Sequence, residues 1–280
     1  MGVMDGVRDD PTRLGETLLA EIFTRLPFEE RLTIVPLVCK TWRDASHDPT
    51  CWRNVDMNGW FKHRAEEDFM WEFEFDCEDE MEFYIKKVVD RSCGQLTELQ
   101  TMHCSDSAIE YLAERSPNLT DLSIRDSPYA TDHAVKKLAE NCKKLQKLDL
   151  SDCYNVGNET LEAFGRNCKS LEWLARNMVR TNDFLSPGPL LDGDDEATIL
   201  SQHLPNLKHL EMKKSSLSDV GLSHLAKGCV QLESLNLACC TLSPYALEQV
   251  PKFCARLKEF VKPIVPRMHV NPKFLMVLFD

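Results

Sequence analysis

The sequence has no long apolar run, and Lys and Arg are a minority of its charged residues. The longest candidate run, residues 274–279, falls well short of the roughly 18 residues that cross a bilayer. The 280 residues include 33 Lys and Arg against 45 Asp and Glu, which gives a net charge of −12. Nucleic acids and anionic membranes require basic surfaces, so neither is expected as a partner. Residues 1–10 also lack the basic start and apolar stretch of a secretory signal, so we expect the protein in the cytoplasm, the nucleus or both.

The motifs of common catalytic and cofactor sites are missing as well. The sequence contains no CxxC pair, no HExxH, no GxSxG and no Gly-rich phosphate loop, and its eight histidines are scattered. Catalytic residues, metal ligands and a cofactor are therefore not predicted, and a non-catalytic role is expected. An enzyme that uses its cysteines remains an alternative, and it would need one unusually reactive thiol.

What the sequence does contain is a repeated leucine pattern between Leu96 and Lys262. Its unit is Leu, two residues and a second apolar residue, usually followed two residues later by a third. Seven copies start 23, 26, 26, 36, 25 and 25 residues apart. This period is typical of a leucine-rich-repeat solenoid, in which each repeat buries its apolar side chains against its neighbours. The copies are Leu96/Leu99, Leu119/Leu122/Ile124, Leu145/Leu148/Leu150, Leu171/Leu174, Leu207/Leu210/Met212, Leu232/Leu235/Leu237 and Leu257/Phe260.

Each copy combines a strand-like and a helical portion. Residues 147–150 alternate polar and apolar side chains, as in a half-buried strand. Apolar residues at spacing three or four follow, and Asp132, Asn158 and Ser218 lie where helix caps are expected. The sequence thus predicts an α/β solenoid of about seven repeats over residues 91–265, with parallel strands on the concave face and helices on the convex face.

The cysteines follow the repeat. Five of the twelve lie three residues before the first Leu of a copy, and three lie eight residues after one. Ser replaces Cys at the same positions in other copies, which suits a small, buried, weakly hydrogen-bonding side chain. We therefore predict structural cysteines and no disulfides or zinc site for Cys93, Cys142, Cys168, Cys229 and Cys254, and for Cys104, Cys153 and Cys240.

The fourth copy is irregular. Arg176 stands where Leu150 and Leu237 stand in other repeats, and the next copy arrives ten residues late. Residues 181–196 contain two Pro and two Gly and are predicted to be a loop, within an inserted segment at 178–203. This insertion is either a tolerated surface loop or part of a binding face, and the sequence leaves both open.

Two flanking segments have no repeat pattern. Residues 57–90 include ten acidic residues between positions 66 and 82, interleaved with aromatic side chains and with no Lys or Arg among them. This segment is predicted to be a linker or a cap for the open end of the solenoid, and an acidic docking segment for a basic partner is the alternative. Residues 266–280 form a C-terminal tail.

Residues 10–56 form a different, helical module. Leu18, Ile22 and Leu26 share one stripe of a predicted helix that Pro27 ends. A second helix follows up to Pro36, which can start a third. Three short helices in about forty residues bury too little to be self-sufficient. We expect the module to complete its burial against a partner or against the first repeat.

The residues of this module resemble an F-box. The resemblance is carried by residues 14–23, by Leu26-Pro27, by Val38-Cys39-Lys40-Thr41-Trp42-Arg43 and by the stretch from Asp48 to Asp56 with its second Trp at position 52. The cysteine-containing repeats are similar to those of F-box/leucine-rich-repeat proteins, and the break at residues 176–178 with the acidic residues 194–196 resembles plant members. The resemblance implies a non-catalytic substrate receptor of a Skp adaptor–cullin–F-box (SCF-type) ubiquitin ligase.

Two sets of binding residues follow from this resemblance. The F-box is expected to dock a Skp-family adaptor, and through it a cullin-RING core, with Leu14, Leu18, Ile22, Leu26, Pro27, Leu32, Val38 and Trp42. The concave face is expected to hold a protein substrate with Arg125, Lys147, Asp149, Trp173, His209, Glu211, Lys213 and Asn236, whose charges are of both signs. The alternative is a scaffold with no ligase role, in which the helical module only caps the solenoid. In that case its apolar residues would point inward.

Overall fold

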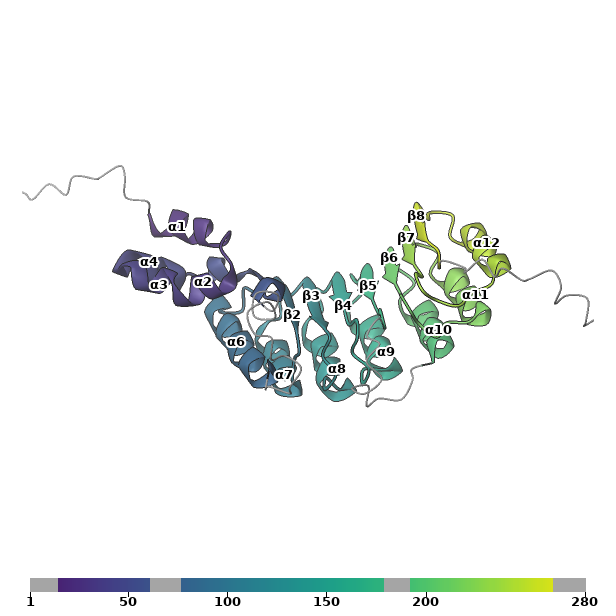
Figure 1. The fold of residues 1–280 in the computed structure, drawn as a ribbon, viewed down its shortest axis with the longest axis horizontal. Helices are drawn as coiled ribbons and strands as arrows, with labels where there is room; N and C mark the ends of the chain where they lie inside the picture. The colour runs from purple at the N-terminus through teal and green to yellow at the C-terminus, as the bar shows by residue number, and fades with distance from the viewer. Residues whose placement is uncertain (1–14, 61–76, 179–191, 264–280) are drawn as a thin grey trace, which may run out of the picture.

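The computed structural model describes residues 15–60, 77–178 and 192–263. The molecule is a curved array with the strands along its inner side, the helices along its outer side, and a small helical module at the N-terminal end (Figure 1). The predicted α/β architecture, a helical module followed by a solenoid, is confirmed. The C-terminal tail at 266–280 and residues 61–76 of the 57–90 segment lie outside the described residues.

The N-terminal module consists of α1 (Glu16–Phe23), α2 (Phe28–Thr33), α3 (Val35–Val38), α4 (Lys40–Ser46) and the 3-10 turn η1 (Pro49–Trp52). The third predicted helix is divided at Cys39, whose backbone is extended with φ −163° and ψ 172°. Cys39 therefore occupies the N-cap of α4, where its side chain is exposed. Cys39 thus does not pack within a helix.

Eight parallel strands form one sheet in chain order. Seven belong to the predicted repeats, whereas β1 ends the N-terminal module and pairs with β2. β1 has three residues and lies outside the repeated leucine pattern that predicted the other short strands, so it could not be predicted. Its presence makes the module continuous with the sheet. The strands are β1 (Asn54–Asp56), β2 (Glu98–Met102), β3 (Asp121–Arg125), β4 (Lys147–Asp149), β5 (Trp173–Ala175), β6 (His209–Glu211), β7 (Ser234–Asn236) and β8 (Glu259–Val261).

The helices α6 (Cys77–Ser92), α7 (Asp106–Arg115), α8 (Asp132–Asn141), α9 (Asn158–Asn167), α10 (Gly193–His203), α11 (Asp219–Gly228) and α12 (Pro244–Phe253) cover the outer side of the sheet (Figure 1). In the register of the sheet, the central apolar residue of each strand lies beside that of the next strand. The ladder runs through Val55, Leu99, Leu122, Leu148, Leu174, Leu210 and Leu235, all buried, and reaches the partly buried Phe260. Each buried leucine stabilises the fold by about 1.5–3 kcal/mol.

The structure also explains the cysteine register. Of the eight cysteines in repeat positions, seven are buried and Cys93, before the first repeat, is exposed. Buried thiols donate weak hydrogen bonds to carbonyl oxygens of the preceding repeat, as from Cys142 Sγ to Ser116 O at 3.4 Å and from Cys153 Sγ to Ile124 O at 3.3 Å. These thiols thus close the corners between neighbouring repeats.

Acidic residues at the start of the outer helices join each repeat to the next. Asp106 accepts hydrogen bonds from the backbone N and the hydroxyl of Thr131, at 2.8 and 2.6 Å. Asp219 accepts one from Ser243 N at 2.9 Å. Of the three predicted caps, Ser218 caps α11 by accepting a hydrogen bond from Val220 N. Asp132 instead accepts one from Gly157 N in the next repeat, and Asn158 is the first residue of α9, which has no side-chain cap.

Helix α10 corrects the predicted loop at 181–196, because it begins at Gly193. The acidic residues 194–196 form its first turn, where negative charge is favoured near the positive end of the helix dipole. Asp192 caps the helix by accepting from Asp194 N at 2.9 Å. The predicted inserted segment at 178–203 is therefore helical from residue 193 onward.

Candidate adaptor and substrate surfaces

The N-terminal module leaves five apolar side chains in solvent. Helix α1 turns Leu19, Ala20 and Phe23 inward, so Leu18 and Ile22 point out with 46% and 41% of their surface exposed. The others follow α2 and lie in α3, where only Val35 is buried. They are Ile34, Leu37 and Val38, exposed by 57%, 78% and 54%. We call these five side chains the exposed apolar set.

Beneath this set the module has a tight core. Phe23 packs against Trp42 with ring centroids 5.1 Å apart. Trp52 is fully buried and donates its indole N–H to Ser46 O at 2.9 Å. Phe23 and Trp52 are thus buried in this core, whereas the side chains of the exposed apolar set are not covered within the described chain.

The predicted adaptor residues divide into three groups. Leu18, Ile22 and Val38 belong to the exposed apolar set, and Pro27, between α1 and α2, is also exposed. Leu26, Leu32 and Trp42 are partly buried against the module core. Leu14 lies outside the described residues. Sequence reasoning missed Ile34 and Leu37. The available signal was the apolar run at 34–38, which is too long for one helix face to bury completely.

The predicted substrate residues come together on the concave face. Their side chains lie in rungs that cross the strands, next to the buried leucine ladder. Lys147, Trp173 and His209 occupy one rung, and Asp149, Glu211 and Asn236 another. Arg125 and Lys213 lie two residues beyond the second rung.

A hollow of about 320 Å³ opens on this face at the irregular repeat. Five of the eight predicted substrate residues line it, and the other three, Lys147, His209 and Asn236, lie beside lining residues in the register of the sheet. Its lining is polar apart from one aromatic and one small residue. The lining residues are Arg125, Asp149, Ser151, Asp152, Trp173, Ala175, Asn177, Glu211 and Lys213.

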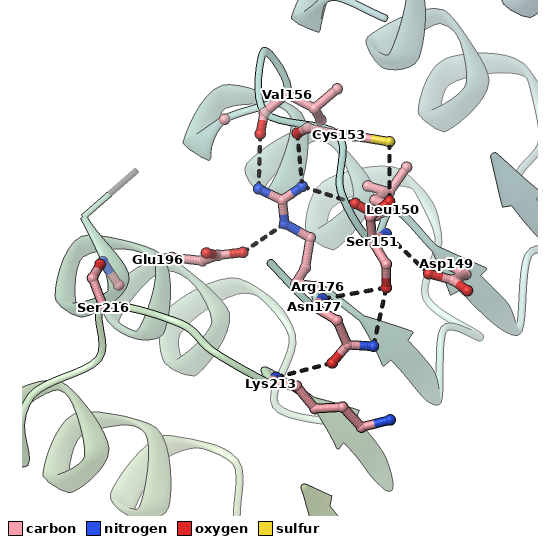
Figure 2. A network of polar contacts seen from close by, with 12 residues as sticks. Asp149, Leu150, Ser151, Cys153, Val156, Arg176, Asn177, Glu196, Lys213 and Ser216 are labelled. Carbon is pink, nitrogen blue, oxygen red and sulfur yellow. Dashed lines mark hydrogen bonds and ion pairs between the residues drawn. The ribbon is translucent and has the colours of Figure 1, made fainter. Parts of the chain in front are cut away.

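Asn177 organises one side of the hollow (Figure 2). Its amide nitrogen donates to Ser151 Oγ and to Glu211 Oε2, both at 3.1 Å, and its oxygen accepts from Lys213 N at 2.9 Å. Lys213 Nζ in turn lies 2.7 Å from Glu211 Oε2. The fourth and fifth repeats are thus joined by a polar network where the leucine spacing is longest.

Arg176 lies behind this network and is fully buried. Its Nε donates to Glu196 Oε1 on α10 at 2.7 Å, and its other nitrogens donate to the carbonyls of Leu150, Cys153 and Val156 at 3.2, 3.3 and 2.8 Å (Figure 2). A buried guanidinium requires such partners. The ion pair therefore joins the two sides of the insertion, and Glu196 is a residue that sequence reasoning missed. Arg176 at a leucine position was the available signal.

A larger hollow of about 430 Å³ lies where the module meets β1 and β2. Arg31 lines it, stacks 5.3 Å from the Trp52 ring centroid and donates to Cys51 O. Desolvation by burial lowers the pKa of Arg31. Since these contacts hold the guanidinium against η1, and the carboxylates of Asp56 and Glu98 also line the hollow, Arg31 is best explained as a structural residue.

Burial disfavours the thiolate form of the interior cysteines. Desolvation by burial raises the pKa of Cys142, Cys153, Cys168 and Cys229 to about 12. Within residues 15–60, 77–178 and 192–263, no three metal-binding side chains come together in a way that could hold a metal ion. In the same part of the chain, no helix is both long and apolar enough to span a membrane.

Comparisons with known proteins identify the class. An F-box-like family model matches residues 16–58. The F-box protein SKIP1 of Arabidopsis thaliana is 37% identical over 91% of this chain and 88% of its own length. The putative F-box/LRR-repeat protein 19 of the same plant is 43% identical over 92% of this chain and 89% of its own. The chain therefore belongs to the plant F-box/LRR-repeat proteins, as the resemblance predicted.

Among solved structures, a crystal structure of the yeast Rad7 and Elc1 complex aligns with a TM-score of 0.44 and 18% identity. The alignment covers 74% of this chain and 52% of that one, and it is too loose to bear on partner or mechanism.

Proposed function

We propose that this protein is the substrate-recognition subunit of an SCF-type ubiquitin ligase. Its F-box would dock a Skp-family adaptor, and its concave face would hold a protein substrate. Membership of the F-box/LRR-repeat family supports this role in general. The observation that carries it is the exposed apolar set, which has the chemistry of an unfilled protein interface.

The proposed adaptor contact is the exposed apolar set with Pro27. Interfaces concentrate their binding energy in a few large apolar or aromatic anchors that become desolvated. Leu37, 78% exposed, and Ile34, 57% exposed, gain most from being covered. The partly buried Leu26, Leu32 and Trp42 would support them from beneath.

In this role the chain makes and breaks no bonds. It would hold substrate lysines near the charged ubiquitin-conjugating enzyme, so that transfer proceeds at a high effective concentration. The raised pKa of the buried thiols supports a non-catalytic role for them.

The test is co-purification of the full chain with a Skp-family adaptor. The wild-type chain should form a 1:1 complex, and Leu18→Asp and Leu37→Asp should each abolish it. Val220→Asp is the matched control, because Val220 is 61% exposed on the outer helix α11. Retained complex in both module variants, or equal loss in the control, would overturn the proposed adaptor surface.

A non-ligase scaffold is the second candidate. It is favoured by β1, which pairs with β2 and makes the module an end piece of the sheet. A scaffold predicts a well-behaved monomer that forms no complex with any Skp-family adaptor. The same co-purification therefore distinguishes the two functions.

A further inference from the structure

The register of the sheet groups acidic side chains on the concave face, which the sequence alone did not show. Two rungs of side chains cross all eight strands, and each holds three carboxylates. Against these six the rungs contain one Lys and one His. The carboxylates are Glu98, Asp121 and Glu259 on one rung and Asp56, Asp149 and Glu211 on the other.

The only lysine on these two rungs of the described strands is already paired. Lys147 Nζ lies 3.2 Å from Asp121 Oδ2. The side chains thus present an excess of negative charge to a partner. The hollow opens among these rungs, and Asp149 and Glu211 of the second rung line it.

Inside the hollow, the second rung places Ala175 between Asp149 and Glu211. Adjacent strands are about 4.8 Å apart, so the two acidic positions are separated by roughly 10 Å across a small, buried residue. Trp173 lies two residues before Ala175 on β5, on the first rung. It supplies an aromatic wall and is only partly buried. An aromatic surface between two carboxylates suits a cation with an apolar stem.

Asp149 is the less satisfied of the two acids. It accepts from Ser151 N at 2.9 Å and from Ser123 Oγ at 3.4 Å, and it has no ion pair among the described residues. Glu211, by contrast, is paired with Lys213 at 2.7 Å. A cationic ligand would therefore approach closer to Asp149.

We propose that this hollow takes an arginine side chain from a basic segment of the protein substrate, stacked on Trp173 and hydrogen-bonded to Asp149. A planar guanidinium can stack on an indole and bind a carboxylate with two parallel hydrogen bonds, whereas an ammonium cannot. The hollow, about 320 Å³, is at the lower end of small-molecule sites, so it suits one side chain of a larger partner. This assignment rests on the proposed substrate-receptor function and specifies its substrate class.

Arg125 and Lys213 also line the hollow, one rung further along the strands. They are the groups that an acidic or phosphorylated segment would use. The three lining carboxylates and the acidic rungs favour a basic segment. Tighter binding of an acidic or phosphorylated segment would contradict this assignment.

The experiment measures binding of short labelled peptides to the full chain by fluorescence anisotropy. Three peptides of equal length and backbone carry a central block of arginine, of lysine or of phosphoserine. The arginine peptide should bind in a saturable manner, about threefold more tightly than the lysine peptide, because only arginine combines stacking with a fork of hydrogen bonds.

Substitutions then locate the contact. Asp149→Asn keeps an oxygen for Ser151 N and removes only the charge, and Trp173→Leu removes the aromatic face. Each should weaken arginine-peptide binding about tenfold. The matched control is Glu98→Gln, which removes one charge from an exposed position on the same face and should weaken binding less than about twofold.

The assignment is overturned if the arginine peptide does not bind, if the phosphoserine peptide binds more tightly, or if Glu98→Gln weakens binding as much as Asp149→Asn. Adaptor co-purification on the same protein samples separates the two proposals. A chain that retains its adaptor but fails to bind the arginine peptide loses this assignment and keeps its proposed function. A chain that binds the peptide but no adaptor loses the ligase role instead.

Discussion

The two ends of this molecule offer opposite surfaces. The N-terminal module exposes Leu18, Ile22, Ile34, Leu37 and Val38, whereas the concave face of the repeats exposes carboxylates around one partly buried Trp. Apolar surface supplies affinity that depends little on salt, while charged surface supplies selectivity and is screened by salt. This division suits a protein that keeps one constant partner at its front end and selects another along its curve.

The difference has a structural origin. In the repeats, every apolar residue of the leucine ladder meets an equivalent residue in the neighbouring strand. The module joins the repeats on its inner side, where β1 pairs with β2 and Phe28 packs against Tyr84 of α6 at 5.6 Å, and the outer side of α1 and α3 faces no repeat within the described chain. Its outward apolar residues therefore have nothing within the described chain to bury them.

The largest expected effect separates the inner and outer apolar residues of the module. Phe23→Ala removes a buried ring that packs on Trp42 and should cost about 3–5 kcal/mol of unfolding free energy. Leu37→Ala removes an exposed side chain and should change it by less than about 0.5 kcal/mol. Denaturant unfolding of both variants measures this contrast. A Leu37→Ala loss as large as that of Phe23→Ala would mean that Leu37 is not an outward residue.

The second prediction concerns the buried ion pair at the insertion. Glu196→Ala leaves the Arg176 guanidinium buried without its carboxylate and should cost about 3–5 kcal/mol. The double variant Arg176→Leu with Glu196→Leu should recover most of this loss, since other repeats have Leu at the position of Arg176. Thermal unfolding of the single and double variants checks both values. Equal destabilisation of the single and double variants would show that the loss does not come from an unpaired guanidinium and that the polar contacts of Arg176 are themselves required.

Acid should loosen the joints between the outer helices. Hydrogen bonds from Lys86, Ser105 and Ser107 lower the pKa of Glu82 below its ordinary 4.5, and hydrogen bonds from Ser243 lower that of Asp219 below 3.8. A lowered pKa in the folded state stabilises the fold above the ordinary value, and this contribution is lost as the pH falls through the folded-state value.

Melting temperatures measured from neutral pH downward should thus begin to fall below about pH 4.5. The gap between the wild type and Glu82→Gln should be widest at neutral pH and close in acid. Asp219 is exposed and Glu82 is partly exposed, so screening by solvent should keep the change small. A gap that widens in acid would contradict the assigned hydrogen bonds.

The smallest effect is on thiol reactivity. At pH 8, iodoacetamide should label the exposed Cys39, Cys93 and Cys239 before any of Cys142, Cys153, Cys168 and Cys229, whose pKa values are near 12. Mass spectrometry of the native protein after timed labelling measures the order. Fast alkylation of one buried cysteine would revive the enzyme alternative.

The repeats could be predicted because their information is periodic. Leu99, Leu122 and Leu148 recur at a spacing that has meaning only if the strands stack, and the sheet register confirms it. The cysteine positions were predicted for the same reason. Arg176 stood out against the same background.

Side-chain orientation and long-range contacts could not be predicted. Nothing in the sequence indicates that Leu37 points outward while Val35 points inward, because α3 is only four residues long. The partner of Arg176 is twenty residues away in sequence and is set by how α10 returns to the sheet. The acidic character of the concave face emerged only when register placed Asp149 and Glu211 on one rung.

The most direct test of the central claim is hydrogen exchange of the full chain, measured alone and with a Skp-family adaptor. If the exposed apolar set is the adaptor surface, the adaptor should slow amide exchange in α1 and α3 and leave strands β3 to β7 unchanged. Unchanged exchange in α1 and α3, or protection confined to the repeats, would contradict this assignment.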